Sequence, residues 1–364
     1  MPERFDVVVL GAGFVGASVA RALAGRGARV VVLDDSREGG RGSRAAAGVA
    51  VPSLRLAADP VLLDFVRAGK ARLDAEVAEL ERAGAAVRRG CGVLRLALRE
   101  PQRAELEETA AAAGMELGRW LDAGELAGVE PLLAGGPALG GYLEAGGYVV
   151  DAERYLAELV GAAARSGAEI RLGVAAGRVA ATGGEVAVET EAGGVVGGIA
   201  VVAAGAWSGR LLGADGLGVR PLRGQALVLG TNAGVELRHV VSTYLGYLAP
   251  AADGVLVGAT EEDAGFAADV TVAGLLHLTS SAARVAPRLR DARFLRAWAG
   301  LRAVTASGRP LIGWLPGGRR IILATGHGGQ GVLTAGLTAD AVVELVERGA
   351  SDVSAPFDPA KAQV

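Results

Sequence analysis

The chain of 364 residues contains a single cysteine, Cys91, and only three histidines. One thiol cannot form an internal disulfide, and it excludes a metal site built from several cysteines. No other constellation of metal-ligating residue types stands out, so we expect no bound metal. Cys91 lies in the apolar, strand-like run Gly90–Leu96, and we expect its thiol to be buried.

The chain also contains few lysines and carries little net charge. Only Lys70 and Lys361 are lysines, and the net charge of −3 gives no reason to expect nucleic acid as a partner. The uncharged residues 192–209 contain two glycine pairs, which favours a turn and a buried strand over a membrane span. A strand follows Met1 almost directly, without the apolar region of a signal peptide, so we expect a cytoplasmic protein with no integral membrane segment.

Apolar residues, in contrast, are plentiful at 51% of the chain. That proportion argues against disorder, and the length exceeds what one simple core organises, so two domains are expected. The sequence leaves the oligomeric state open, a homo-oligomer included.

The first 35 residues carry the most informative pattern. Residues 5–10 predict a buried strand, Gly11-x-Gly13-x-x-Gly16 predicts a tight turn into a helix over 14–25, and residues 29–34 predict a second strand that ends in Asp34. The glycines allow a tight turn, close approach of a pyrophosphate and close packing of the helix, whose N-terminus favours phosphate. An acid about 20 residues further on accepts from a ribose hydroxyl. The pattern therefore predicts dinucleotide binding.

The rest of the chain alternates between helical and strand patterns. Helices are predicted over 59–83, 101–114, 122–131, 152–166, 269–286 and 332–348. Strands are predicted over 91–98, 168–172, 199–203, several times within 222–260, over 293–305 and over 321–324, with a hairpin over 178–190. The segment 39–48 is either a linker or a loop beside a ligand that leads into a helix.

Three predicted strands, at 5–10, 199–203 and 321–324, are short, apolar on both faces and followed by glycine. Such strands belong to a parallel sheet covered by helices. We therefore expect an α/β fold with a discontinuous Rossmann-type domain over 1–50, 148–215 and 300–364. The inserted substrate domain, over 51–147 and 216–299, should have a mainly antiparallel sheet with flanking helices.

Several segments taken together resemble the FAD-dependent glycine oxidase and D-amino acid oxidase family. They are spread in the family's order over almost the whole chain: 7–34, 39–52, 147–156, 201–209, 221–228, 247–259, 298–314 and 324–335. The resemblance implies a Rossmann-type FAD domain, a substrate domain with a large antiparallel sheet, and FAD bound without a covalent link, because Cys91 lies outside the FAD segments.

The resemblance also implies which residues contact FAD. Asp34 matches the ribose-binding acid, with Asp35 as the alternative, and residues 43–48 match the loop beneath the diphosphate and ring. Ala204, Gly205 and Trp207 match a second contact, Ala176 a backbone contact to adenine, and the helix start after His327 the flavin pyrimidine edge. The expected cofactor-binding residues are Gly11, Gly13, Phe14, Val15, Gly16, Asp34, Asp35, Ser43, Arg44, Ala46, Ala47, Gly48, Ala176, Ala204, Gly205, Trp207, Arg302, Gly328, Gly329, Gln330, Gly331 and Val332.

The residues expected to act on the substrate are Arg302, Tyr247 and Gly329. A flavin oxidase must hold the substrate carboxylate, and the planar fork of arginine suits that group. Arg302 matches the family's carboxylate-binding arginine, Tyr247 its active-site tyrosine, and Gly329 a loop carbonyl that accepts from the amine. We do not assign His327 as a base, because hydride transfer needs none.

The resemblance implies oxidation of small or neutral D-amino acids or glycine by hydride transfer to flavin N5. O2 is reduced to H2O2, and keto acid and ammonia are released. Residues 328–330 read Gly-Gly-Gln, where glycine oxidases of thiamine synthesis carry a bulky residue, arginine and asparagine, so strict glycine specificity is not implied. The alternatives are a sarcosine or N-methyl amine oxidase, a quinone-linked D-amino acid dehydrogenase and, third, a non-catalytic flavoprotein subunit.

Overall fold

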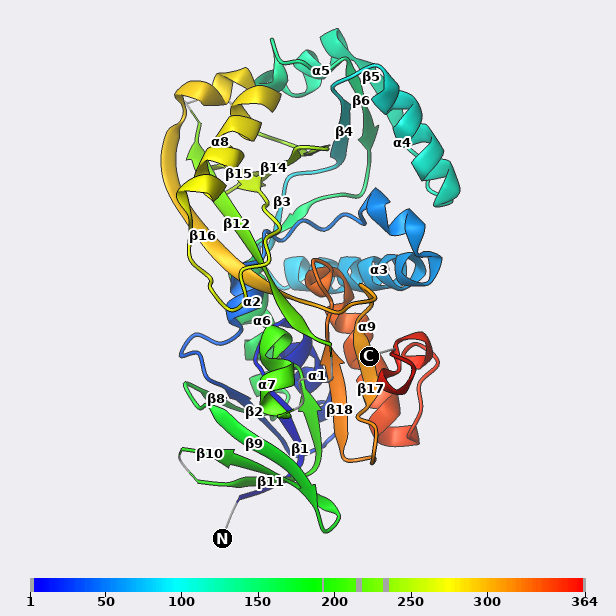
Figure 1. Ribbon diagram of the computed structural model, residues 1–364, viewed down its shortest axis with the longest axis vertical. Helices are drawn as coiled ribbons and strands as arrows, with labels where there is room; N and C mark the ends of the chain where they lie inside the picture. The colour runs from blue at the N-terminus through cyan, green and yellow to red at the C-terminus, as the bar shows by residue number, and fades with distance from the viewer. Residues whose placement is uncertain (1–2, 192, 214–217, 232–235, 363–364) are drawn as a thin grey trace.

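The computed structural model describes residues 3–191, 193–213, 218–231 and 236–362, which form two lobes, each built on an eight-stranded sheet (Figure 1). The helices are α1 (Phe14–Ala24), α2 (Arg41–Arg44), α3 (Pro60–Arg82), α4 (Pro101–Ala112), α5 (Ala123–Val129), α6 (Ala152–Arg165), α7 (Ser208–Leu211), α8 (Val272–Val285) and α9 (Gly331–Arg348). The strands are β1 (Glu3–Leu10), β2 (Val30–Asp34), β3 (Arg88–Arg89), β4 (Val93–Ala97), β5 (Arg119–Asp122), β6 (Gly140–Glu144), β7 (Val149–Val150), β8 (Glu169–Leu172), β9 (Ala176–Thr182), β10 (Glu185–Thr190), β11 (Val195–Val202), β12 (Arg220–Gly230), β13 (Val240–Thr243), β14 (Gly246–Ala251), β15 (Gly254–Gly258), β16 (Arg293–Val304), β17 (Leu311–Trp314) and β18 (Ile321–Thr325).

The first sheet has the strand order β17-β18-β11-β1-β2-β8. Strands β18, β11, β1, β2 and β8 run parallel, and β17 pairs antiparallel at the edge. The three apolar strands that the sequence placed in one parallel sheet are therefore neighbours, as predicted. Because parallel strands share one direction, the turns that follow β1, β11 and β18 all lie at the same edge of the sheet.

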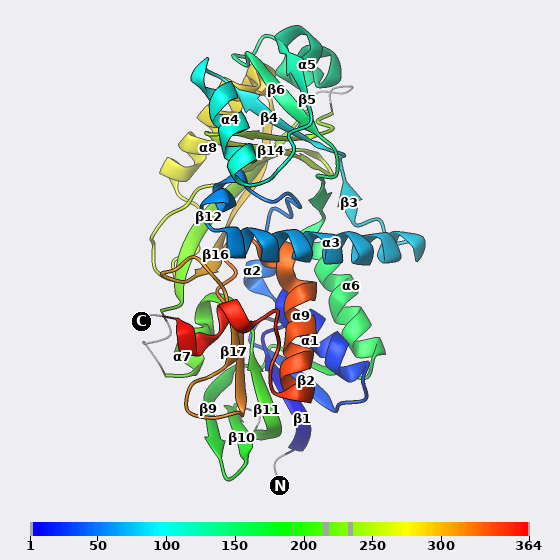
Figure 2. The same ribbon diagram turned by 90° about the vertical axis from the view of Figure 1, so that its right-hand side faces the viewer.

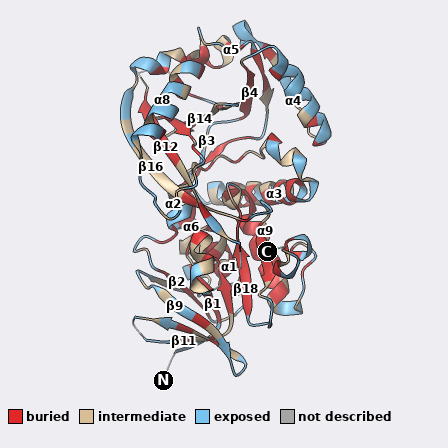
Figure 3. Cartoon of the chain, viewed as in Figure 1, coloured by how far each residue is buried: buried red, intermediate tan, exposed pale blue. Residues whose placement is uncertain are grey.

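Helices cover one face of this sheet, where α1 and α9 pack on alternating residues of β1 and β2 (Figure 2). The opposite face is covered by the hairpin of β9 and β10, which also pairs with β11. With apolar layers on both faces, β2, β18 and the second half of β1 are wholly buried (Figure 3). This arrangement confirms the Rossmann-type prediction and explains why the buried parts of these strands are apolar on both faces.

The second sheet has the order β16-β12-β15-β14-β13-β4-β6-β5. All its pairs are antiparallel except β4 with β13. Buried residues of α5 and α8 pack with those of β4, β12, β13, β14 and β15 in one cluster. The mainly antiparallel sheet with flanking helices is thus confirmed.

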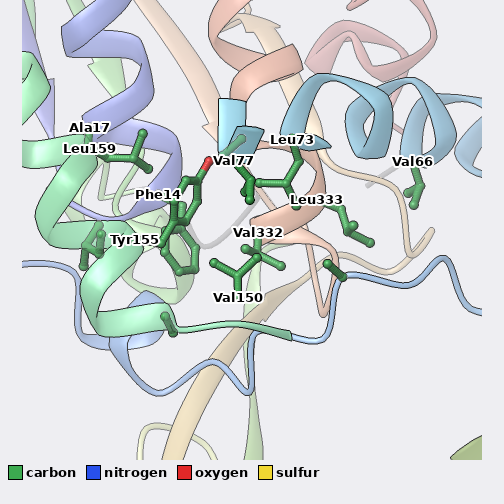
Figure 4. Close-up of a cluster of buried hydrophobic side chains, with 14 of the residues drawn as sticks. Phe14, Ala17, Val66, Leu73, Val77, Val150, Tyr155, Leu159, Val332 and Leu333 are labelled. Atoms are coloured by element: carbon green, nitrogen blue, oxygen red, sulfur yellow. The ribbon is translucent and has the colours of Figure 1, made fainter. Parts of the chain in front are cut away.

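Helix α3 crosses between the lobes and packs on α9 (Figures 1 and 2). Its apolar face contributes to a core cluster that also contains Phe14 of α1, Tyr155 of α6 and Val332 of α9 (Figure 4). Within it, Tyr155 donates to the buried Glu76 of α3 over 2.6 Å. This cluster fixes the N-terminal ends of α1 and α9, which matter for the site.

Three details differ from the sequence prediction. Cys91 is exposed, not buried, because it lies in a turn between Gly90 (φ 67°) and Gly92 (φ 79°), and the strand begins only at Val93. Gly197 and Gly198 lie inside β11 instead of in a turn, since a side chain at 197 would crowd Val8 on the neighbouring strand. Strands β3, β5, β6, β7 and β17 were not predicted.

None of the helices in the described part of the chain combines the length and the apolar character needed to cross a membrane. Over the same residues, no group of three or more histidine, cysteine, aspartate or glutamate side chains is placed to hold a metal ion.

Candidate active site

A cavity of about 910 Å³ lies between the two sheets. Its wall takes residues from the turns after β1, β11 and β18, from the segment 40–56, and from β4, β12, β13, β14 and β16. Because the turns after parallel strands face one way, the topology itself gathers these distant segments in one place.

The turn after β1 is packed too tightly for side chains. Gly11 has φ 107°, and a Cβ atom there would lie 2.5 Å from the carbonyl oxygen of Ala203. A Cβ atom on Gly16 would collide with the carbonyl oxygen of Gly11, so α1 packs directly against its own turn. Gly16 is therefore a packing residue and is not part of the cavity wall, whereas Gly11 and Gly13 are.

Asp34 ends β2 at the cavity and connects two neighbouring segments. Its Oδ2 atom accepts from the backbone N–H of Ala12 (2.7 Å) and of Gly40 (3.1 Å), and its Oδ1 atom accepts from Ser36 (2.9 Å). A carboxylate has about four acceptor positions, so one remains for a ligand hydroxyl. Asp35 also lies in the wall, but its side chain is half-exposed and pairs with Arg41 at 3.3 Å.

The segment 40–48 lies against the N-terminus of α1. Ser43 Oγ accepts from the backbone N–H of Phe14 over 2.9 Å, and Ala45 accepts at its carbonyl from Trp298 Nε1 over 3.0 Å. Arg44 is turned away from the cavity, and its guanidinium donates to the carbonyls of Glu38 and Gly39. The segment is thus a loop at the cavity with one helical turn, which decides between the two readings left open by the sequence.

Gly48 and Gly205 both line the cavity but need glycine for different reasons. A Cβ atom on Gly48 (φ 70°) would collide with the carbonyl of Val150, so close packing explains this glycine. A Cβ atom on Gly205 (φ 53°) would meet nothing within 4 Å, and its carbonyl accepts from Ser208 (2.8 Å) and Thr325 (3.0 Å). Gly205 therefore presents an open surface to the cavity.

The start of α9 also contributes to the cavity wall. Residues 328–332 all line the cavity, and no side chain caps the helix at Gln330. The helix is 18 residues long, so its N-terminus carries the partial positive charge of an aligned backbone. His327 precedes it and is buried, with Nε2 3.0 Å from Thr338 Oγ1.

Burial lowers the pKa of His327 to about 4 in the folded protein, compared with 6.5 for the free side chain. The unfolded chain therefore binds the extra proton between these two pH values. The stability that the neutral imidazole contributes is complete above pH 6.5 and is lost as the pH falls towards 4. At pH 5 the loss amounts to about 2 kcal/mol.

We accordingly expect His327→Gln to flatten the pH dependence of stability. Urea unfolding midpoints, measured at pH 7 and pH 5, should fall more in the wild-type protein than in this variant. The exposed His277→Gln serves as the matched control and should behave as wild type. Equal losses in wild type and His327→Gln would show that this imidazole is not held neutral.

Arg302 lies on β16, lines the cavity and extends over Gly224 of the neighbouring strand β12. A Cβ atom on Gly224 of β12 would lie 2.5–2.6 Å from three atoms of the Arg302 guanidinium, so only glycine lets the group lie there. Arg302 Nη1 donates to the carbonyl of Thr260 over 3.0 Å. Thr260 is itself held by Gln225, whose backbone N–H donates to Thr260 Oγ1 over 2.9 Å. No carboxylate of the described residues pairs with Arg302, so the cation is free to bind an anion.

Tyr247 on β14 lies over Gly258 of β15, its direct neighbour across the antiparallel pair. A side chain at position 258 would collide with the Tyr247 hydroxyl. Desolvation raises the pKa of the Tyr247 phenol to about 12, although the charge of Arg302 lowers it in part. The phenol is therefore protonated near neutral pH and can donate to the anion that Arg302 attracts.

The family model for FAD dependent oxidoreductases matches residues 6–345. The chain belongs to this family. It is an FAD-dependent oxidoreductase, as the resemblance implied.

Its relatives include a glycine oxidase from Geobacillus kaustophilus, 29% identical over 357 residues, which cover 96% of this chain and 94% of that one. A crystal structure of glycine oxidase from the same organism has a TM-score of 0.89 at 28% identity and covers 100% of both chains. An iminodiacetate oxidase from Chelativorans sp. has a TM-score of 0.86 at 28% identity and covers 97% of this chain and 98% of that one.

The residues of the cavity wall fit FAD in their chemistry. Gly11 and Gly13 leave bare backbone beside the N-terminus of α1, where a diphosphate is stabilised. Asp34 retains an acceptor position, and Gly205 leaves open surface. A second helix N-terminus, that of α9, faces the same cavity.

The structure brings together nearly all the residues predicted for the site. All of them line the cavity except Gly16 and Arg44. Sequence reasoning missed several polar wall residues, namely Arg41, Arg55, Arg95, Arg210, Gln225, Ser242 and Glu261. Arg41 lies in the glycine-rich segment that the sequence left open as a linker or a loop beside a ligand. For the others the sequence offers no distinctive spacing.

Proposed function

We propose that this oxidoreductase oxidises small or neutral D-amino acids, glycine or both, with O2 as the electron acceptor. The carbon that bears the amine loses a hydride and the nitrogen a proton, and the resulting imine is hydrolysed to keto acid and ammonia. Bound FAD supplies the two-electron acceptor and allows O2 to be reduced to H2O2. The names of the relatives, glycine oxidase and iminodiacetate oxidase, agree with an amine that lies one carbon from a carboxylate.

The observation that carries the proposal is the unpaired Arg302 guanidinium at the cavity wall. Its Nη1 atom is occupied by the Thr260 carbonyl, which fixes the plane of the group and leaves its other donors for a ligand. A carboxylate matches that planar fork with charge-assisted bonds. The Tyr247 hydroxyl, protonated and without a hydrogen-bond partner among the described residues, supplies a further donor.

The amine is assigned to the loop before α9, which lies beside Arg302 because the backbone N–H of Gly328 donates to the Ala303 carbonyl over 2.7 Å. The carbonyl of Gly329, in the loop before α9, is proposed to accept from the amine, which must be neutral for a hydride to leave. His327 is buried, neutral near pH 7 and bonded to Thr338, which supports the absence of a histidine base. The chain therefore acts by binding and orienting the substrate and needs no further acid or base.

The proposed positions of FAD follow the same geometry. The N-terminus of α1, with Gly11 and Gly13, would hold the diphosphate, and Asp34 the ribose. Ala176 would contact the adenine, and the start of α9 the flavin ring. The division into an FAD domain over 1–50, 148–215 and 300–364 and a substrate domain over 51–147 and 216–299 remains our proposal, as do a cytoplasmic location and a possible homo-oligomer.

We expect Gly224→Ala to impair substrate binding with little loss of stability. The added methyl group would displace the Arg302 guanidinium, a flexible side chain, so the fold can adapt while the fork moves. A misplaced charge-assisted pair costs about 1–2 kcal/mol, so KM should rise roughly 5- to 30-fold. Steady-state kinetics on the purified flavoprotein measures this effect.

Gly230→Ala, on the same strand, is the matched control, because its Cβ would make ordinary contacts of 3.4 Å with Leu295. It should leave KM unchanged. If Gly224→Ala also has the KM of wild type, the guanidinium does not bind the substrate from this position.

A peroxide assay tests the function directly. The yellow holoenzyme should release H2O2 with D-alanine, D-proline or glycine in the presence of O2. Turnover of sarcosine in preference to these compounds would favour the N-methyl amine oxidase alternative. Turnover of D-alanine with a quinone but not with O2 would favour the dehydrogenase alternative.

A further inference from the structure

Part of the cavity wall lies along the second sheet beside Tyr247, and we call this part of the cavity the side pocket. We define the side pocket by six wall residues: Val49, Val51, Val93, Arg95, Val240 and Ser242. Ser242 of β13 is directly opposite Tyr247 of β14 on one side and Arg95 of β4 on the other. Directly opposed residues in a sheet point to the same face, so these three side chains form one row facing the cavity.

The walls of the side pocket are apolar, and its end is polar. Val93 and Val240 are directly opposed on β4 and β13. Each lies two residues before Arg95 or Ser242 on its strand and therefore on the same face of the sheet. Adjacent strands lie about 4.8 Å apart, so Arg95 stands roughly 10 Å from Tyr247 across two strands. The pocket therefore has room for a short side chain between an anchored carboxylate and the polar end.

The Arg95 side chain is buried in the cavity wall, with only 5% of its surface exposed. Its Nε atom donates to Glu144, and its Nη2 atom donates to Glu144 (3.1 Å) and to the carbonyl of Pro52 (3.3 Å). Its Nη1 atom and the Ser242 hydroxyl make no hydrogen bond with the described residues, yet both keep some accessible surface. Two donors at the end of the side pocket are thus unused.

The charge of Arg95 is balanced by the bidentate pair with Glu144. The pocket end therefore offers hydrogen-bond donors with little net charge. An uncharged acceptor gains these bonds at small desolvation cost, whereas a second carboxylate would also approach Glu144. An apolar substrate side chain of the same shape would leave these donors without a hydrogen-bond partner, and an unsatisfied buried donor costs free energy.

We propose that the side pocket receives the substrate side chain, and that Ser242 and Arg95 select uncharged side chains that end in a hydrogen-bond acceptor, such as the amide of asparagine. The inference rests on the proposed function, because Arg302 and Tyr247 must first fix the carboxylate. It assigns specificity to residues that take no part in the reaction at the amine carbon.

Three amino acids of nearly the same shape test the proposal: D-leucine, D-asparagine and D-aspartate. The wild-type holoenzyme should show kcat/KM for D-asparagine roughly tenfold above D-leucine, and D-aspartate should not exceed D-asparagine. Ser242→Ala should lower the D-asparagine to D-leucine ratio several-fold. Arg95→Met combined with Glu144→Gln, which removes the pair without leaving a buried charge, should lower it further.

Ser280→Ala, an exposed serine on α8, is the control and should keep the wild-type ratio. Because the test is a ratio, general effects on FAD or O2 cancel. A wild-type preference for D-leucine overturns the proposal, and so does a ratio that Ser242→Ala leaves unchanged. If the double variant does not fold, Ser242→Ala alone decides.

Failure of the proposed function would appear separately, as no turnover of any amino acid, glycine included. The side pocket is then tested by binding, through the change in flavin absorption when D-asparagine or D-leucine is added to the holoenzyme. Tighter binding of D-asparagine that weakens in Ser242→Ala supports the inference. Equal binding of the two, or no binding of either, overturns it.

Discussion

Arg302→Ala is expected to lower kcat/KM for D-alanine or glycine by roughly 10²- to 10⁴-fold. The substitution removes a cavity-wall cation that pairs with no carboxylate of the described residues, and with it two charge-assisted hydrogen bonds, each of which contributes about 1.5–3 kcal/mol. Most of the effect should appear in KM. Arg302 itself lines the cavity, so its truncation enlarges an existing cavity and leaves the packed cores intact, and the fold should survive.

Arg302→Lys separates charge from geometry. A lysine keeps the cation but offers no planar fork, so we expect a loss of roughly tenfold instead of the full effect. FAD content, read from the absorption spectrum, should equal that of wild type in both variants. If Arg302→Ala has the wild-type KM while FAD is bound, Arg302 is not the carboxylate anchor.

Gly13→Val is expected to weaken FAD binding by roughly 10- to 100-fold. A Cβ atom on Gly13 would lie 2.8 Å from Ser43 Oγ, the atom that accepts from the backbone N–H of Phe14. The branched side chain would push the segment 40–48 away from α1, and overpacking of this kind costs about 1–3 kcal/mol. Both segments line the cavity in which FAD would bind, so their displacement should weaken FAD binding.

The measurement is the dissociation constant of FAD from the apoprotein, followed by flavin fluorescence. Ser43→Ala should weaken binding only a few-fold, because it removes one hydrogen bond without steric conflict. Gly128→Ala on α5, where a Cβ would meet nothing within 4 Å, is the control and should bind as wild type. Unchanged affinity in Gly13→Val would show that this turn does not hold the cofactor.

The sequence alone predicted the parts of the fold that depend on local pattern. The buried parts of β1, β11 and β18 consist mainly of consecutive apolar residues, and the glycines of the first turn are spaced by steric need, so both could be recognised. Cys91 shows the limit of this reasoning. Its neighbours are apolar, but the two adjacent glycines with positive φ turn the chain outward and expose the thiol.

The second sheet shows what local pattern cannot supply. Arg95 and Ser242 are almost 150 residues apart, and they meet only because β4 and β13 pair in parallel inside a mainly antiparallel sheet. Gly224 reads as an ordinary strand glycine until β16 places Arg302 against it. The candidate site residues predicted from the sequence came from the glycine motif and from the family resemblance, whereas the side pocket became visible only through strand register.

Anaerobic mixing of the holoenzyme with amino acids tests the central claim most directly, namely that Arg302 holds the substrate carboxylate beside bound FAD. D-alanine or glycine should bleach the flavin absorption with saturation, L-alanine should not, and Arg302→Ala should need roughly 100-fold more substrate for the same rate. Bleaching by the same concentrations in wild type and Arg302→Ala, or by none of the amino acids, would contradict the account.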